Sequence, residues 1–156
     1  MDDSNNLKKA RSRALRYLTY RARTLKELKE YLLRKDYAPD LISQVVSEMI
    51  EYGYIDDSRF AEDYITYRKP RGYGRNRVRH ELGLKGIDRE VIDEKIADSF
   101  CYEDDLSIIK NMLERRYPAE GKIDEKWISR QVGFLRRRGY QDSLIIEAIR
   151  DYKLSD

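Results

Sequence analysis

The sequence predicts an all-α fold of three tandem three-helix repeats, about nine helices in all. One pattern recurs in residues 26–46, 76–96 and 129–149, where Leu32, Leu82 and Leu135 coincide at offsets of 50 and then 53 residues. Apolar residues recur at helical spacing, and no long stretch alternates apolar and polar side chains as a strand would. A period near 50 indicates one supersecondary unit stacked in series, which offers a long surface in place of a closed pocket. This favours binding over catalysis.

The first repeat is predicted over residues 7–55. Its first helix, which ends before Thr24, carries leucine and alanine at helical spacing. Thr24 and Glu27 have the spacing of a capping box, which opens the second helix. Pro39 begins the third helix, and Gly53 ends it.

The second repeat is predicted over residues 56–101. Asp56 or Asp57 caps its first helix, since aspartate at this position satisfies free backbone N–H groups and favours the positive end of the helix. The loop around Tyr73 follows. Val78, Leu82 and Leu84 are expected to face inward on the middle helix, in an order that repeats the first module.

The third repeat is predicted over residues 102–153. Asp124 is a cap, and Trp127 after it is expected in the core. Gln131 departs from the pattern, because the other two copies have an apolar residue there, and Val132 is expected to take over its packing. In all three repeats the turn before the last helix holds a residue type that tolerates a left-handed backbone, namely Asp36, Gly86 and Gly139.

Composition limits the function further. The 156 residues are 39% charged and 40% hydrophobic, which suits exposed helices with one apolar stripe each, and the net charge is only +3. Cys101 is the one cysteine, so no disulfide can form within the chain and a reducing cytoplasm is favoured. No signal-peptide core and no run of about 20 apolar residues occurs, so no membrane is implied.

Catalytic and metal chemistry find little support in the residues. His80 is the only histidine and has no cysteine nearby in sequence, so a zinc site or a Ser-His-Asp device is not predicted. No glycine-rich phosphate loop occurs. Cys101 follows an apolar helix end and is expected to be buried, and Tyr54 and Phe60 are interpreted as structural. We therefore predict neither enzymatic activity nor a cofactor.

The stretch from Gly53 to Ala61, which reads GYIDDSRFA, resembles the junction between the first two repeats of the RecX family of bacterial recombination regulators. Weaker similarities cover about residues 10–152. The resemblance implies three three-helix repeats in an elongated, curved array. It also implies a non-enzymatic modulator of the RecA recombinase, usually inhibitory, that lies in the groove of the RecA–DNA filament and hinders ATP turnover and strand exchange.

Basic clusters are the candidate contacts with DNA or RecA, because arginine grips phosphate or carboxylate with two donors. Tyr73 could stack on a base. A solvated helix face is the alternative for any single arginine. Reversing the charge of Arg75 and Arg77 together is expected to leave the fold intact and to weaken inhibition. The candidates are Arg68, Lys69, Arg71, Tyr73, Arg75, Arg77 and Arg79, then Arg130, Arg136, Arg137 and Arg138, with Arg11, Arg13, Arg16, Arg21 and Arg23 of the first helix ranked below them.

Three hypotheses for function follow. The first is a cytoplasmic, monomeric protein that binds the RecA filament together with single- or double-stranded DNA, and modulates, most often inhibits, recombination. The second is a stand-alone DNA-binding protein, for which steep salt dependence would be typical. The third is a helical scaffold for another protein.

Overall fold

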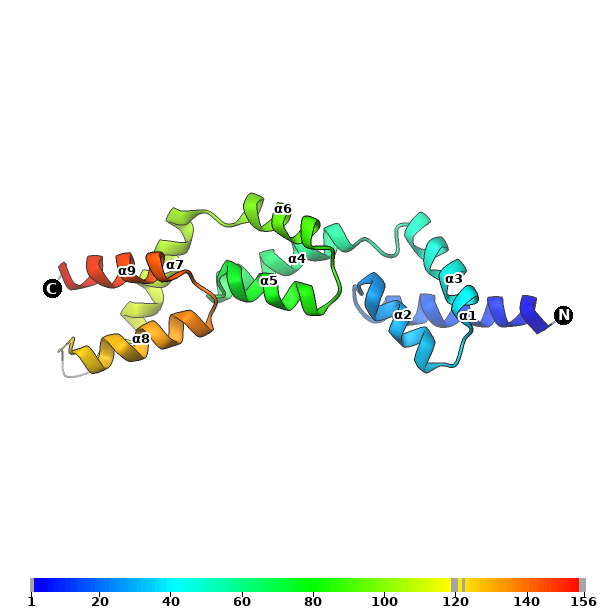
Figure 1. Ribbon diagram of the computed structural model, residues 1–156, viewed down its shortest axis with the longest axis horizontal. Coiled ribbons are helices and arrows are strands. Elements are labelled where there is room, and N and C mark those ends of the chain that lie inside the picture. The colour runs from blue at the N-terminus through cyan, green and yellow to red at the C-terminus, as the bar shows by residue number, and fades with distance from the viewer. Residues whose placement is uncertain (1, 119–120, 122, 155–156) are drawn as a thin grey trace. The chain divides into compact units, whose positions relative to one another are not determined.

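A computed structural model describes residues 2–118, 121 and 123–154. Over these residues the chain forms nine α-helices and one short 3-10 helix, and no strand (Figure 1). The all-α prediction is therefore confirmed. The elements are α1 (Asp2–Tyr20), α2 (Leu25–Arg34), α3 (Pro39–Glu51), α4 (Asp57–Arg68), η1 (Lys69–Arg71), α5 (Arg75–Leu84), α6 (Arg89–Ser99), α7 (Tyr102–Arg115), α8 (Glu125–Arg137) and α9 (Asp142–Leu154).

The chain divides into two compact units. Unit 1 is Met1–Glu62 with Leu82–Ile92, and unit 2 is Asp63–Glu81 with Asp93–Asp156. Helices α4, α5 and α6 thus contribute residues to both. The repeat boundaries 7–55, 56–101 and 102–153 stay a prediction, and residues 119, 120 and 122 of the last range lie outside the described residues.

Unit 1 has its core between α1, α2 and α3. Ala10 and Ala14 of α1 are fully buried, and their small side chains let the neighbouring helices approach closely. The predicted capping box opens α2: Thr24 Oγ1 accepts from the Glu27 N–H at 3.2 Å, and Glu27 Oε2 accepts from the Thr24 N–H at 3.0 Å. The two bonds satisfy backbone donors that a helix start leaves free.

Unit 2 has its core between α7, α8 and α9. Trp127 is buried there, as expected, and its indole N–H donates to the Arg116 carbonyl at 2.9 Å. The predicted cap is also present, since Asp124 accepts from the backbone N–H of Trp127 at 2.7 Å. Val132 was expected to take the packing position of Gln131, but Gln131 is itself buried. It is 3% exposed, and its side-chain oxygen accepts a hydrogen bond from Arg116 Nε at 2.6 Å. One hydrogen bond thus satisfies a buried amide oxygen.

The turns before α3, α6 and α9 have the left-handed backbone that the sequence predicts. The φ angles are +61° at Asp36, +82° at Gly86 and +93° at Gly139. Gly53, which follows α3, has a φ of +78°. Each turn reverses the chain after a helix and allows the next apolar residue to pack back on it.

In unit 1 the first turn of α2 docks on the turn before α6. Thr24 Oγ1 donates to the Lys85 carbonyl at 2.8 Å. Asp57 accepts from the free N–H of Leu25 at 2.9 Å, so it caps α2, while Asp56 caps α4 by accepting from the Arg59 N–H at 3.1 Å. The sequence did not decide which of the two aspartates is a helix cap, and in the structure each of them caps a different helix.

In unit 2 the first turn of α5 docks in the same way on the turn before α9. The Gly74 N–H donates to the Arg138 carbonyl at 2.7 Å, and the Asn76 N–H donates to the Gly139 carbonyl at 3.0 Å. A β-carbon at Gly139 would lie 2.3 Å from the backbone nitrogen of Arg77. Glycine is therefore required for close approach as well as for backbone angle.

Two expectations about burial were wrong. Cys101 is exposed, because it occupies the N-cap position of α7 and Phe100 takes the buried place beside it. Leu84 is 65% exposed, since Val78 and Leu82 already occupy the inward face at a spacing of four. The structural interpretation of Tyr54 concerns its backbone: its N–H donates to the Met49 carbonyl at 2.9 Å, while the residue is 56% exposed on the turn after α3.

Candidate interaction surface

Glu81 on α5 is the centre of the basic segment 68–79. Its carboxylate accepts from Arg68 Nε at 3.0 Å, from the Tyr64 hydroxyl at 2.5 Å and from Arg77 Nε at 3.0 Å. Burial by itself would raise the pKa of Glu81, but the hydrogen bonds from Arg68, Tyr64 and Arg77 lower it to about 2. The carboxylate therefore stays charged and neutralises two of the candidate guanidinium groups.

The ring of Tyr73 is half-buried among three other candidates. The guanidinium carbon of Arg68 lies 3.5 Å from the ring centroid, that of Arg138 4.4 Å and that of Arg77 5.5 Å. Cations at these distances are attracted to an aromatic face. The structure thus brings the loop at Tyr73 and the end of α8 together within unit 2, which 65 residues of separation in sequence did not reveal.

Backbone carbonyls hold three more cations of the segment. Lys69 Nζ donates to the Ser99 carbonyl at 2.6 Å and meets Asp104 at 3.2 Å. Arg75 donates to the Phe100 carbonyl at 3.4 Å. Arg71 donates to the Tyr67 carbonyl at 2.6 Å, and its guanidinium carbon lies 3.7 Å from the centroid of the Tyr67 ring.

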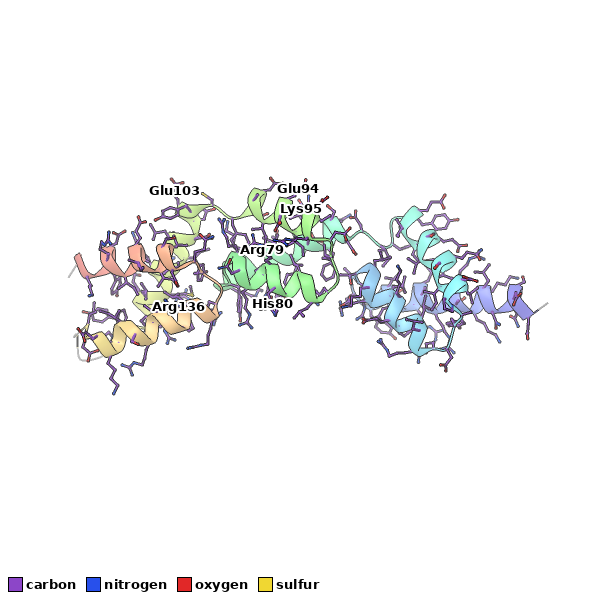
Figure 2. All side chains as sticks on the ribbon, in the orientation of Figure 1. Arg79, His80, Glu94, Lys95, Glu103 and Arg136 are labelled. Carbon is purple, nitrogen blue, oxygen red and sulfur yellow. The ribbon has the colours of Figure 1, made fainter. Side chains whose placement is uncertain are left out.

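Arg77 and Arg79 complete the segment. Arg77 also donates to the Arg137 carbonyl at 3.0 Å. Arg79 reaches from α5 to Asp93 on α6 at 3.1 Å (Figure 2). The expectation that reversing Arg75 and Arg77 leaves the fold intact stays a prediction, and both side chains donate to backbone carbonyls, those of Phe100 and Arg137.

A buried carboxyl lies close to two of these cations. Asp105 on α7 is 2% exposed, and burial raises its pKa, while the charges of Lys69 and Arg75 act in the opposite direction. A buried carboxylate needs nearby positive charge to remain ionised. Part of the positive charge of the segment therefore stabilises a buried carboxylate and so supports the fold.

Helix α8 presents a different arrangement. Arg136 pairs with Asp142 at 2.7 Å on the exposed surface (Figure 2), and Arg138 donates to the Arg71 carbonyl at 3.2 Å. Arg130 and Arg137 are exposed, and within the described residues their guanidinium groups have no carboxylate or carbonyl partner. They are seven residues apart, which places them on one face of α8 about 10 Å apart along its axis.

Glu81 neutralises two cations of the basic segment, yet it is not among the candidate residues that the sequence predicts. Its spacing of four from Arg77 is a signal for an ion pair within a helix. Its bonds to Tyr64 and Arg68 depend on how α4 packs against α5 and leave no such signal.

Other site types find no support within the described residues. Groups of three or more histidine, cysteine, aspartate or glutamate side chains placed to hold a metal ion are absent there. His80 lies exposed on α5 (Figure 2). None of the helices described has the length and apolar character needed to cross a bilayer.

The fold and this surface define a class: an all-helical protein of three-helix groups with charged faces. Two family models match, RecX, first three-helix domain, over residues 10–49 and RecX, second three-helix domain, over residues 56–96. A regulatory protein RecX from Trichlorobacter lovleyi is 35% identical over 135 residues, which cover 85% of this chain and 88% of that protein. The chain belongs to the RecX family of regulatory proteins.

Longer relatives and a solved structure agree with this. The regulatory protein RecX of Bacillus subtilis is 31% identical over 93% of this chain, and that of Bacillus licheniformis is 33% identical over 97%. The chain spans 55% and 59% of those two proteins, respectively. The crystal structure of RecX from Lactobacillus salivarius has a TM-score of 0.87 at 22% identity, over 97% of this chain and 99% of that chain, which is a likeness of fold.

Proposed function

We propose that this chain binds the RecA–DNA filament and inhibits its ATPase and strand-exchange activities, acting as a cytoplasmic monomer without catalysis of its own. Membership of a family of regulatory proteins carries the proposal. The resemblance of the repeat junction to RecX proteins supplies RecA as the partner. In this proposal the bound helices occupy the groove of the RecA–DNA filament and hinder the entry of a second duplex.

The distribution of charge supports a filament as the target. Residues 86–105 contain eight acidic and two basic side chains, and all the acidic ones except Asp105 are exposed, among them Glu94 on α6 and Glu103 on α7 (Figure 2). Exposed arginines lie on α8. A filament groove contains DNA phosphates and protein of both signs, so a surface of two signs complements it better than a uniformly basic one.

Arg130 and Arg137 are the best-supported contacts of the candidate set. Their guanidinium groups can bind phosphate or carboxylate without breaking a bond of the fold, whereas Arg68, Lys69, Arg75 and Arg77 would have to exchange one partner for another. Their positions on one face of α8 allow both to touch the same partner. The other candidates act in this proposal by shaping the surface.

The test is the ATPase rate of RecA filaments on single-stranded DNA, titrated with this protein, beside its binding to the same DNA without RecA. We expect the rate to fall at concentrations at which bare DNA remains unbound. An unchanged rate would contradict the proposal. If bare DNA is coated first, with steep salt dependence, the stand-alone DNA-binding hypothesis replaces it.

Arginine variants sharpen this test. We expect Arg130→Ala with Arg137→Ala to raise the concentration needed for half-inhibition by about tenfold or more, since each lost charged contact is worth about 1 kcal/mol or more. Arg115→Ala with Lys126→Ala removes the same charge from exposed positions of α7 and α8 and serves as the matched control. Equal effects of the two pairs would show that only net charge matters.

A further inference from the structure

Helix α1 in unit 1 carries a basic groove, and two of the lower-ranked candidates, Arg13 and Arg16, line it. The groove has a volume of about 470 Å³, and no acidic side chain lines it. All the lining residues on α1 are exposed, and Tyr31 of α2 is half-buried. The lining residues are Lys8, Lys9, Ser12, Arg13, Arg16 and Tyr31.

The wall of this groove is held in place by aromatic packing. Tyr31 stacks on Tyr17 with ring centroids 4.0 Å apart and planes 1° apart, and the guanidinium carbon of Arg23 lies 4.1 Å from the Tyr17 centroid. The buried Ala10 and Ala14 fix the opposite side of α1 in the core. The cations therefore project from a helix that is rigidly seated.

The cations of the groove differ from those of the 68–79 segment. Within the described residues, Lys8, Lys9, Arg13 and Arg16 have no ion pair, whereas Arg68, Lys69, Arg77 and Arg79 each have a carboxylate partner. Four unneutralised cations along a helix face produce a local positive potential that attracts anions. Arg11 on the same helix is not part of this set, because it is paired with Glu48.

The spacing favours a polymeric anion over a small one. Lys9, Arg13 and Arg16 lie at intervals of four and three residues, so they share one face and extend over about 10 Å of the helix. The long, exposed side chains do not enclose a small ligand, but a row of cations about 10 Å long suits a chain of successive phosphates. Ser12 adds a hydroxyl donor between them.

We propose that this groove on α1 binds the phosphate backbone of a nucleic acid. It is a second contact with nucleic acid, on the first helix of the chain, and its existence does not require the RecA filament to be the target of the protein. Sequence-independent binding follows from the chemistry, because cations and a hydroxyl contact phosphates without reading bases.

The test uses the full chain, a fluorescein-labelled single-stranded oligonucleotide and fluorescence anisotropy at several salt concentrations, without RecA. We expect Arg13→Ala with Arg16→Ala to weaken binding about tenfold or more and to lower the slope of log affinity against log salt by roughly 1.4, or about 0.7 for each lost phosphate contact. Circular dichroism verifies that the variant is folded.

The matched control is Lys29→Ala with Arg34→Ala, which removes the same charge from exposed positions of the neighbouring helix α2. An equal loss in this pair, or unchanged binding in the groove pair, would overturn the proposal. Poly-glutamate serves as a second probe: loss of poly-glutamate binding with DNA binding intact would assign the groove to an acidic protein instead. Since the comparison between the variants contains no RecA, failure of the groove pair to change binding would leave the ATPase test of the proposed function unaffected.

Discussion

Glu81 accepts hydrogen bonds from three side chains on two helices, and this one residue changes the role of the cations around it. Arg68 and Arg77 are neighbours in a strongly basic sequence, yet both are held against a carboxylate of which the side chain is only 15% exposed. A charge run in sequence therefore measures how many cations are present and not how many are available.

A substitution at Glu81 tests this at the residue scale. The folded-state pKa of about 2 lies below the ordinary 4.5, so the charged form contributes stability above pH 4.5, and that contribution is lost as the pH falls from 4.5 to about 2. We expect Glu81→Gln to lower the free energy of unfolding by about 2 kcal/mol at neutral pH. The difference from the wild type should shrink across that acidic window.

Urea denaturation at a series of pH values measures this difference. Glu90→Gln, at an exposed position of α6, is the control and should change little at any pH. A constant difference between wild type and Glu81→Gln from neutral pH down to 2 would contradict the assignment.

At the scale of helices and turns, local rules were sufficient for what the sequence predicted. The capping box at Thr24, the cap at Asp124 and the left-handed turns at Gly86 and Gly139 depend on residues within four positions of one another. The partners of Glu81 and the burial of Gln131 depend on contacts between successive helices, across 13 to 17 residues of sequence. Such contacts follow from tertiary packing, which no local pattern encodes.

The docking of a helix start on a turn can be tested with two glycines. Gly53→Ala adds a β-carbon that meets nothing within 4 Å. Only the strain of the left-handed backbone should therefore lower the free energy of unfolding, by about 1 kcal/mol. Gly139→Ala should cost about 3 kcal/mol or more, because its β-carbon would displace the first turn of α5. Chemical denaturation compares the two, and equal losses would contradict the docking.

At the scale of the whole molecule, the two compact units share three helices. Because α4, α5 and α6 each run from one unit into the other, melting one unit would break helices that the other needs. We expect a single calorimetric transition with equal van't Hoff and calorimetric enthalpies. Thr24→Ala in unit 1 and Glu81→Gln in unit 2 should both lower the temperature of this transition. A second, separate transition in either variant would contradict the cooperative unfolding of the two units.

The turn at Asp36 differs from the turns at Gly86 and Gly139 in carrying a side chain. Gly86 and Gly139 each receive the first turn of a helix from the preceding repeat, and each can do so because its α-carbon is bare. Asp36 has the same left-handed backbone but carries a side chain where that contact would form. Duplicating the middle repeat would supply both halves of the joint, the helix start and the bare turn, whereas a repeat joined ahead of the first would also require glycine at position 36. Such a protein can lengthen from within more readily than from its first repeat.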